Sequence, residues 1–348
     1  EGHGLNKDSI KYLQSLEVSL LITVDCGSSS VEEIQFANSC GIDVIVTDHH
    51  SIPKIKPKAI ALINHNRKDS KYPFRGLAGV GLAFKLAQAI YMQLGKPYPS
   101  ELLEFVAMGT IADMVPLKGE NRTLVNLGIK SLNSSKNPGI NAIIQSARLT
   151  NAKIDSEKIA FYLAPRLNAP GRLDDPIVSL KLLTTNSEIE AEELSRKIEA
   201  INNKRKELTQ TQLETARSKV NPYFDNQQLI FMGEYGVNPG ISGLVAGNLA
   251  SDYYKPTVYY SIQENLVRGS ARSIPEFNIT DALSECSDLF ENYGGHSQAA
   301  GFVINLSKLE QLESRLTTIA NNKLKGANLT PTIQIDIEAS PSQLVGET

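Results

Sequence analysis

Two segments of the chain place carboxylate and imidazole side chains directly after short apolar, β-branched runs. Asp25 follows Leu20–Val24, and Asp48, His49 and His50 follow the run Asp43–Thr47. Carboxylate and imidazole donors together suit Mn²⁺ or a similar divalent cation better than an all-sulfur site would. Two adjacent cations of this kind generate hydroxide and stabilise an in-line displacement at phosphorus. The residue types therefore point to metal-dependent chemistry on a phosphate ester.

The elements that must position these residues form a predicted β-α-β unit. The stretch between the two runs, Val31–Ser39, has the apolar spacing of a helix, whereas both runs have the length and composition of strands. In parallel α/β sheets, ligands bind beyond the carboxyl ends of the strands. Asp25 and the Asp48–His50 segment should therefore meet at one edge of one sheet. A third strand, Ala59–Ile63, also ends in polar residues.

A further carboxylate, Asp113, ends an apolar helical segment that begins near Glu101 and precedes Pro116. Each of these groups has a plain structural alternative when it is taken alone. Asp25 would be the cap of a helix that begins near Ser29, and the histidine pair and Asp113 would be loop and turn residues. Their joint occurrence in this order favours a metal site.

The rest of the chain predicts an α/β fold in two parts, and the length of 348 residues also favours two domains. Helices are expected at residues 82–94, 101–113, 122–132, 156–163 and 177–183, followed by a long helix from Ser187 to Lys219 that is too polar for a core. Strands are then expected at 228–232, 257–261, 266–271 and 301–306, with helices at 241–253, 279–292 and 308–321. We therefore predict a parallel-sheet domain over 1–186, a connecting helix over 187–220 and a smaller mixed α/β domain over 221–330.

The bulk composition narrows the class of protein. A hydrophobic fraction of 41% and a charged fraction of 21% are ordinary for a globular protein, and no apolar run is long enough to span a bilayer. The three cysteines are widely separated and form no C-x-x-C pattern, so neither a disulfide framework nor a zinc site is expected. The net charge of −3 requires any nucleic-acid binding to come from local basic patches. A cytoplasmic protein without membrane association fits these features best.

Three of the segments resemble motifs of the DHH phosphoesterase superfamily. They are Val24-Asp25-Cys26-Gly27, Asp48-His49-His50 and Thr110-Ile111-Ala112-Asp113, which look like its second, third and fourth motifs. Three further segments, in the right order, resemble signatures of the RecJ exonucleases within that superfamily: residues 164–173, 268–273 and 294–302. The resemblance extends over essentially the whole sequence. It implies a DHH domain joined by the long helix to a DHHA1-like domain.

This resemblance implies roles for the residues that match. Asp25, His49 and Asp113 are implied to bind Mn²⁺ or Mg²⁺, and Asp25 bridges two ions in the family's complete site. His50 is implied to face the phosphate, and Asp48 to orient a histidine. Together these five residues form the expected catalytic set. The implied activity is exonucleolytic hydrolysis of single-stranded DNA, 5′ to 3′, in DNA repair and recombination. A monomer that works with a single-strand-binding protein and a helicase is implied by the same resemblance.

Two pairs of arginines are expected to hold phosphates. Arg268 and Arg272 alternate on a predicted strand and so share a face, and guanidinium groups match phosphate geometry; Ser273 of the same segment is assigned with them. A solvated strand face is the alternative. Arg166 and Arg172 flank a proline-rich, sharply turned loop that can hold both over a groove. Salt bridges to the acidic residues at 174 and 175 explain this second pair equally well.

Three glycine-containing segments are candidates for close approach to a ligand. Gly294, Gly295 and His296 are expected between a helix and a strand, where an ordinary turn is the alternative and the resemblance favours contact with the DNA backbone or a terminal phosphate. The segment that opens a helix at Pro239 can hold an anion at the helix N-terminus. Gly76–Gly81 lacks the spacing of a dinucleotide-binding fingerprint and is interpreted as tight helix packing.

Both ends of the sequence are expected to be truncated. The family's first motif, a strand ending in paired aspartates, lies upstream of the segment that Glu1–Asn6 resembles, and this sequence contains no counterpart. We therefore expect an incomplete two-metal site and weak or absent nuclease activity in this chain. Residues 331–348, with a strand-like stretch at 332–337, resemble the start of an oligonucleotide-binding barrel. Without the rest of that barrel, DNA binding is expected to be weaker than in the parent protein.

Two other functions remain open at this point. A DHH phosphodiesterase acting on short oligonucleotides or cyclic dinucleotides would share the metal motifs and Gly294–His296, but such relatives generally lack a counterpart of Pro165–Leu173. A DNA-tracking scaffold that has lost its metals would have no chemical reason to keep Asp25, both histidines and Asp113. The exonuclease is therefore the preferred prediction.

Overall fold

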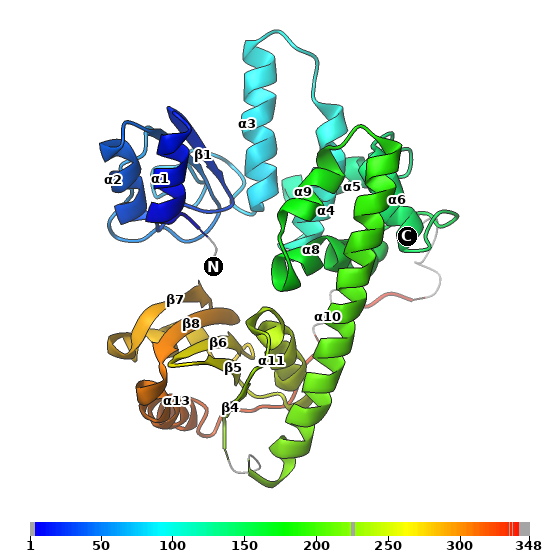
Figure 1. The fold of residues 1–348 in the computed structure, drawn as a ribbon. Helices are drawn as coiled ribbons and strands as arrows, with labels where there is room; N and C mark the ends of the chain where they lie inside the picture. Colours follow the sequence, from blue (N-terminus) through cyan, green and yellow to red (C-terminus); the bar gives the residue numbers. More distant parts are fainter. Residues whose placement is uncertain (1–3, 224–226, 334, 336, 341–348) are drawn as a thin grey trace. The chain divides into compact units, whose positions relative to one another are not determined.

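The computed structural model describes residues 4–223, 227–333, 335 and 337–340, with only the backbone described at 221–223 (Figure 1). The chain separates into two compact units, one formed by residues 1–170 and 176–202 and the other by 171–175 and 203–348. The division falls inside α8 (Ala164–Leu173) and inside α10 (Glu188–Tyr223), so each of these helices contributes to both units. The predicted α/β class is confirmed, while the domain boundaries given above stay a prediction. No helix in the described part of the chain is long and apolar enough to cross a membrane.

The first unit begins with a three-stranded parallel sheet in the order β1 (Leu20–Val24), β2 (Asp43–Thr47), β3 (Ala61–Ile63). Helices α1 (Lys7–Ser15) and α2 (Val31–Ser39) pack on one face of it around Ile10, Ile34, Val44 and Val46. Val44 and Val46 are two positions apart on β2 and so point to the same face, because successive residues of a strand point to opposite sides. The carboxyl ends of all three strands meet at one edge, as the β-α-β pattern predicts.

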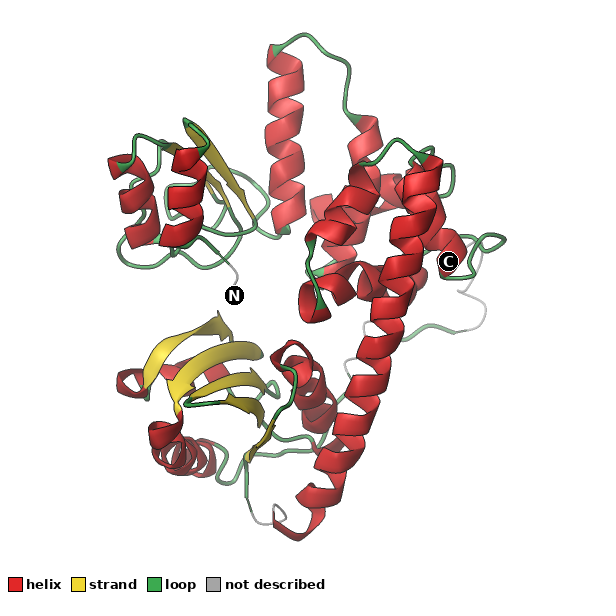
Figure 2. Ribbon diagram, in the orientation of Figure 1, coloured by secondary structure: helices red, strands yellow, loops and turns green. Residues whose placement is uncertain are grey.

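Helices make up the rest of the first unit (Figure 2). In order they are α3 (Gly79–Gln93), η1 (Ser100–Leu102), α4 (Leu103–Ala112), α5 (Gly119–Leu132), α6 (Pro138–Ser146), α7 (Ser156–Lys158), a π-helical turn η2 (Ile159–Leu163), α8 (Ala164–Leu173), α9 (Ile177–Thr184) and the start of α10. Their core includes Ile140, Ile143 and Leu182, all fully buried. Gly128 lets α4 and α5 approach closely, since a Cβ there would lie 2.2 Å from the carbonyl oxygen of Leu103.

The turned loop expected around Pro165 and Pro170 is wrong, because these residues lie in the helix α8. Proline is disfavoured inside helices because it lacks an N–H donor. Here Pro165 is the second residue of α8, separated by one residue from the π-helical turn η2, which departs from the regular helical ladder. Ala164, Ala169 and Pro170 are buried, so apolar packing outweighs the unfavourable propensity.

The second unit contains a five-stranded mixed sheet in the order β4-β5-β6-β8-β7. Its strands are β4 (Ile230–Tyr235), β5 (Thr257–Gln263), β6 (Leu266–Arg272), β7 (Phe290–His296) and β8 (Ala299–Asn305), with only the β4–β5 pair parallel. Helix α11 (Pro239–Tyr253) packs on one face with Ile230 and Tyr259. Helices α12 (Ile279–Ser284) and α13 (Leu309–Lys323) cover the other face, with short 3-10 turns η3 (Ser287–Leu289) and η4 (Leu306–Lys308) between the elements.

Gly294, Gly295 and His296 lie in the edge strand β7 rather than between a helix and a strand, so the turn that was weighed as the alternative is not what this segment forms. The predicted helix over 279–292 ends at Ser284; the turn η3 follows, and β7 begins at Phe290. The ring of Phe290 lies 5.2 Å from that of Phe302 on β8, measured between centroids, and Tyr293 pairs with the same residue across the strands. Aromatic pairs of this kind stabilise a sheet.

The C-terminal segment departs from the pattern read in the sequence. The strand-like stretch at 332–337 is not a strand at its described positions 332, 333, 335 and 337, and residues 341–348 lie outside the described residues. The sequence pattern also missed α1 and α6. Asn137 caps α6 by accepting the N–H of Ile140 over 3.0 Å, with Pro138 at the first helical position, a signal that was available.

Candidate metal centre and phosphate-binding residues

Asp25 leaves the end of β1 in a left-handed backbone conformation. Its φ is 64°, a region that few residues other than glycine adopt, and its N–H donates to the carbonyl of Thr47 over 2.9 Å. The N-cap position of α2 is Ser30, so Asp25 does not cap this helix. The alternative role weighed for Asp25 is therefore excluded. An unusual backbone held by its neighbours is typical of residues that a site positions.

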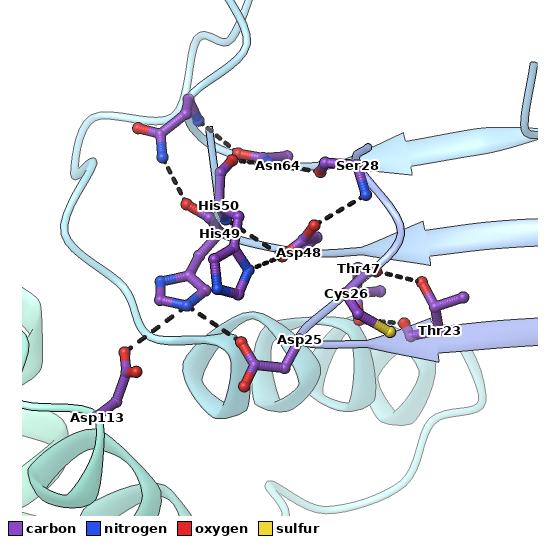
Figure 3. Close-up of polar contacts among 11 residues, drawn as sticks. Thr23, Asp25, Cys26, Ser28, Thr47, Asp48, His49, His50, Asn64 and Asp113 are labelled. Carbon is purple, nitrogen blue, oxygen red and sulfur yellow. Dashed lines mark hydrogen bonds and ion pairs between the residues drawn. The ribbon is translucent and has the colours of Figure 1, made fainter. Parts of the chain in front are cut away.

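His49 lies between two carboxylates (Figure 3). Its Nε2 is 3.1 Å from Oδ1 of Asp25 and 3.7 Å from Oδ2 of Asp113, yet this buried nitrogen makes no hydrogen bond. The nearby Asp25 carboxylate raises the pKa of His49; burial opposes this and Asp113 adds to it. A buried imidazole nitrogen without a hydrogen bond, flanked by two carboxylate oxygens, is the arrangement that a divalent cation would complete.

Asp48 is almost fully buried and orients His50 rather than His49. Its Oδ1 accepts from Nδ1 of His50 over 2.7 Å and from the backbone N–H of the same residue over 3.2 Å, and its Oδ2 accepts from the N–H of Ser28 over 2.9 Å. Burial alone would raise the pKa of Asp48, but these hydrogen bonds outweigh it and hold the pKa well below its usual range. An ionised Asp48 favours the His50 tautomer with hydrogen on Nδ1. The predicted role in orienting a histidine therefore has a geometric basis.

Asp113 stands at the end of α4, where the sequence places it. It is the C-cap residue of that helix, and its N–H donates to the carbonyl of Gly109 over 3.0 Å. Met114 follows with a φ of 60° and a side chain that is 88% exposed, so the chain turns sharply after the carboxylate. The turn brings Asp113 to the histidine from an element other than the sheet.

Two asparagines that the sequence interpretation passed over hold the backbone of the histidine pair. Nδ2 of Asn64 donates to the carbonyl of His50 over 2.9 Å and to Oγ of Ser28 over 2.9 Å. Nδ2 of Asn66 donates to the carbonyl of His49 over 2.6 Å. Both follow β3 at the shared sheet edge, so the polar residues after the third strand were the signal that could have found them.

The residues present fit a divalent cation. Single ligand atoms of Asp25, His49 and His50 lie within 4.8 Å of one another, and Asp113 adds a second carboxylate to the same imidazole. Hard oxygen and borderline nitrogen donors of this kind suit Mn²⁺ or Mg²⁺.

In the second unit, two guanidinium groups lie together at the first turn of α11. Nη1 of Arg172 donates to the carbonyl of Gly240 over 3.2 Å, and a Cβ on Gly243 would lie 2.8 Å from Nη2 of Arg272. Neither arginine has a carboxylate partner among the described residues. Burial lowers the pKa of both side chains, and Arg172 lowers that of Arg272 further. Two like charges without a counter-ion at a helix N-terminus form a setting suited to an anion.

Comparison with known proteins agrees with these two settings. The family described as "DHH family, N-terminal domain" matches residues 3–110, and the "DHHA1 domain" matches residues 226–322. The single-stranded-DNA-specific exonuclease RecJ of Bacillus subtilis is 36% identical over 350 residues, covering 100% of this chain and 44% of that protein. RecJ of Escherichia coli is 32% identical over 368 residues, covering 100% of this chain and 64% of that protein. The chain is therefore similar to RecJ exonucleases over its whole length.

The similarity to RecJ extends to the fold. The crystal structure of RecJ from Thermus thermophilus in complex with Mn²⁺ superposes with a TM-score of 0.82 at 29% identity, covering 91% of this chain and 47% of that one. The chain spans 44% of the length of RecJ from Bacillus subtilis and 64% of the length of RecJ from Escherichia coli.

The remaining RecJ-like residues fall into different settings. Arg268 and Arg272 share one face of β6, as predicted, on the side where α11 packs. The hydroxyl of Ser273 donates to the carbonyl of Phe277 over 2.6 Å. In β7, Gly294 has no atom within 4 Å of where a Cβ would lie, whereas a Cβ on Gly295 would lie 2.3 Å from the carbonyl oxygen of Ala299.

Arg166 lies in a setting different from the phosphate-binding one expected from the resemblance to RecJ. Nε and Nη2 of its buried side chain donate to the carboxylate of Glu199 over 2.6 Å and 3.2 Å, and Nη1 donates to the carbonyl of Tyr162 over 2.8 Å. The partner is thus Glu199 rather than the acidic residues at 174 and 175. Of the two roles weighed for Arg166, this geometry favours the structural salt bridge.

Proposed function

We propose that the protein is a metal-dependent exonuclease that hydrolyses phosphodiester bonds of single-stranded DNA. The observation that carries this proposal is the position of His49 Nε2 between the carboxylates of Asp25 and Asp113, at 3.1 Å and 3.7 Å. These three residues would hold Mn²⁺ or Mg²⁺. A bound cation of this type supplies an activated water and neutralises charge on the phosphate.

The chain's own groups orient the substrate phosphate beside that site. Asp48 fixes the ring of His50 through its 2.7 Å hydrogen bond. The imidazole therefore already has one orientation in which to contact a phosphate oxygen, and less side-chain entropy is lost on binding. Nδ2 of Asn64 donates to the backbone carbonyl of His50 over 2.9 Å and so holds its main chain. Asp48 and Asn64 position His50 without help from the proposed metal ligands Asp25, His49 and Asp113, which supports the assignment of His50 as a phosphate contact.

The second unit would hold the nucleic-acid backbone. Arg172 and Arg272 provide two half-buried positive charges at the N-terminus of α11, and Arg268 lies on the same strand face as Arg272. Gly294, Gly295 and His296 are proposed to approach the DNA from the exposed edge strand β7, with Ser273 nearby in sequence at the end of β6. Phosphate contacts of this sort bind single strands without reading sequence and weaken as salt rises.

The test uses end-labelled single-stranded and double-stranded DNA with Mn²⁺, and the full-length protein that carries these residues. Digestion of single strands alone, abolished by Asp25→Asn and by His49→Ala, is the expected result. Cleavage of dinucleotides with no activity on long strands would instead identify the short-substrate phosphodiesterase. Digestion that survives both substitutions would overturn the metal centre.

From the family resemblance we further propose 5′-to-3′ polarity and a role in DNA repair and recombination. A monomer in the cytoplasm that works beside a single-strand-binding protein and a helicase belongs to the same proposal. Labelling the substrate at one end and then at the other decides the polarity, because only one label is released at once as a mononucleotide.

A further inference from the structure

The first turn of α3 touches both elements that carry the carboxylates of the metal centre. We propose that this turn, here called the spacer, sets the separation of Asp25 and Asp113. Gly79 lies against the side chain of Asp25, and the side chain of Val80 packs against Gly109 of α4. The inference rests on the proposed function, since it concerns the positioning of that centre's ligands. Gly79, Val80 and Gly109 act as positioning residues only.

Gly79 receives the side chain of Asp25 against its backbone. A Cβ at position 79 would lie 2.2 Å from Oδ1, 2.4 Å from Cγ and 2.6 Å from Cβ of Asp25. The aspartate cannot simply swing away, because its Cβ is among the crowded atoms and its N–H is bonded to the carbonyl of Thr47 at 2.9 Å. Glycine at position 79 is therefore what allows this carboxylate to lie beside His49.

Val80 packs at the point where α4 has no side chain. A Cβ on Gly109 would lie 2.8 Å from Cγ1, 3.0 Å from Cβ and 3.3 Å from Cγ2 of Val80. The carbonyl of Gly109 also accepts the N–H of Asp113 over 3.0 Å in the last turn of that helix. A change that pushes α4 away at Gly109 would therefore move the backbone of Asp113 with it.

A buried amide joins the same two regions a second time. Asn121 is 1% exposed, and its Nδ2 donates to the carbonyl of Gly76 over 2.6 Å and to that of Pro116 over 3.1 Å. One side chain thus ties the segment before α3 to the segment after Asp113. The glycine contacts and this amide act on the same distance, between Asp25 and Asp113.

The spacer is tested by Mn²⁺ affinity, measured by titration calorimetry on DNA-free, full-length protein. Gly79→Ala and Gly109→Ala are each expected to weaken binding at least about tenfold, the scale on which groups that orient metal ligands act. Gly81→Ala is the matched control, because it makes the same change in the same helix but the three atoms nearest to its Cβ would all belong to Leu77, the closest at 3.2 Å. It should bind as the wild type does.

A rescue distinguishes positioning from general damage to the fold. Adding Val80→Ala to Gly109→Ala removes Cγ1 and Cγ2, two of the three crowding atoms, and should restore most of the Mn²⁺ affinity. In an Asp25→Asn background, Gly79→Ala should cause no further loss, because it acts through Asp25. A fully additive loss, or no rescue, would overturn the spacer. If Gly79→Ala does not fold, the Gly109 pair decides the matter alone.

Asp25→Asn separates failure of the spacer from failure of the proposed function. Unchanged Mn²⁺ affinity in Asp25→Asn would refute the metal centre itself. Weakened affinity in Asp25→Asn, with wild-type affinity in both glycine variants, would refute the spacer and leave the metal centre standing.

Discussion

The buried carboxylate of Asp48 accepts a hydrogen bond from the ring of His50, two residues along the chain, over 2.7 Å. Its other oxygen accepts the N–H of Ser28 over 2.9 Å, so both carboxylate oxygens are already engaged within the protein. Asp48 and Asp25 therefore do different work, although both follow strands of the same sheet. Asp48 orients an imidazole, whereas Asp25 is proposed to bind a cation.

This division predicts that Asp48→Asn and Asp25→Asn fail in different ways. Asp48→Asn should lower kcat about 10- to 100-fold, by analogy with other groups that orient active-site histidines, and change Mn²⁺ affinity little. Steady-state nuclease assays and calorimetry on the same preparations measure both. Asp43→Asn, at the exposed start of β2, is the control. An equal loss of Mn²⁺ affinity in both variants would show that Asp48 is itself a ligand.

Arg166 and Glu199 should prove to be a structural pair. Because the guanidinium is buried and bonded to the carboxylate through two nitrogens, Arg166→Met leaves a partly buried charge alone and should cost about 2–4 kcal/mol of stability. Chemical denaturation measures this cost, and the double variant Arg166→Met/Glu199→Leu should recover most of it. Folded Arg166→Met should bind single-stranded DNA normally at low temperature. Loss of DNA affinity without loss of stability would restore the phosphate-contact role.

Arg272 should show the opposite behaviour. It lies half-buried beside Arg172 without a carboxylate partner in the described chain, so Arg272→Met should leave the melting temperature unchanged or raise it. The same variant should bind single-stranded DNA about tenfold more weakly, with a salt slope smaller by about 0.7, the value for one lost phosphate contact. Fluorescence anisotropy across a salt series measures both quantities. Arg196→Met, on an exposed face of α10, should change neither, and a destabilised Arg272→Met with normal DNA affinity would refute the anion site.

Tyr259 should limit stability at high pH. Burial raises the pKa of Tyr259 to about 12, against an opposing hydrogen bond donated by Gln212. Below about pH 10 the phenol is neutral in both the folded and the unfolded chain, so its full contribution is present. Between about pH 10 and 12 only the unfolded chain ionises, and stability is lost. Tyr259→Phe should therefore lose less melting temperature than the wild type on going from about pH 9 to 11, by a few degrees. Tyr235→Phe, 69% exposed, should match the wild type.

The proximity of Asp25, His49 and Asp113 was easier to predict from the sequence than the setting of Arg166, for a physical reason. Asp25 and His49 follow adjacent parallel strands, and strand ends converge at one edge whatever the rest of the fold does. Asp113 was found because a helix end is readable from its apolar run. No such rule places Arg166, whose partner Glu199 lies on another helix and depends on how the helices pack.

Secondary structure was misjudged where tertiary packing overrides local preference. The two prolines in α8 suggested a loop, but burial keeps that segment helical. Gly294 and Gly295 suggested a turn, yet pairing with β8 holds them in a strand. The close packing of Asp25 against Gly79 could not be predicted either. The two residues are 54 positions apart, and the packing depends on the absence of a Cβ at position 79.

The left-handed backbone at Asp25 restricts which amino acids can occupy the end of β1. At a φ of 64°, aspartate, asparagine and glycine are tolerated far better than branched or bulky residues. Among the acidic side chains the position therefore prefers the shorter one on conformational grounds alone, before any question of reach to a cation arises. Natural variation at this position is thus filtered by main-chain geometry as well as by chemistry, and a chain that loses its carboxylate here should most readily drift to asparagine.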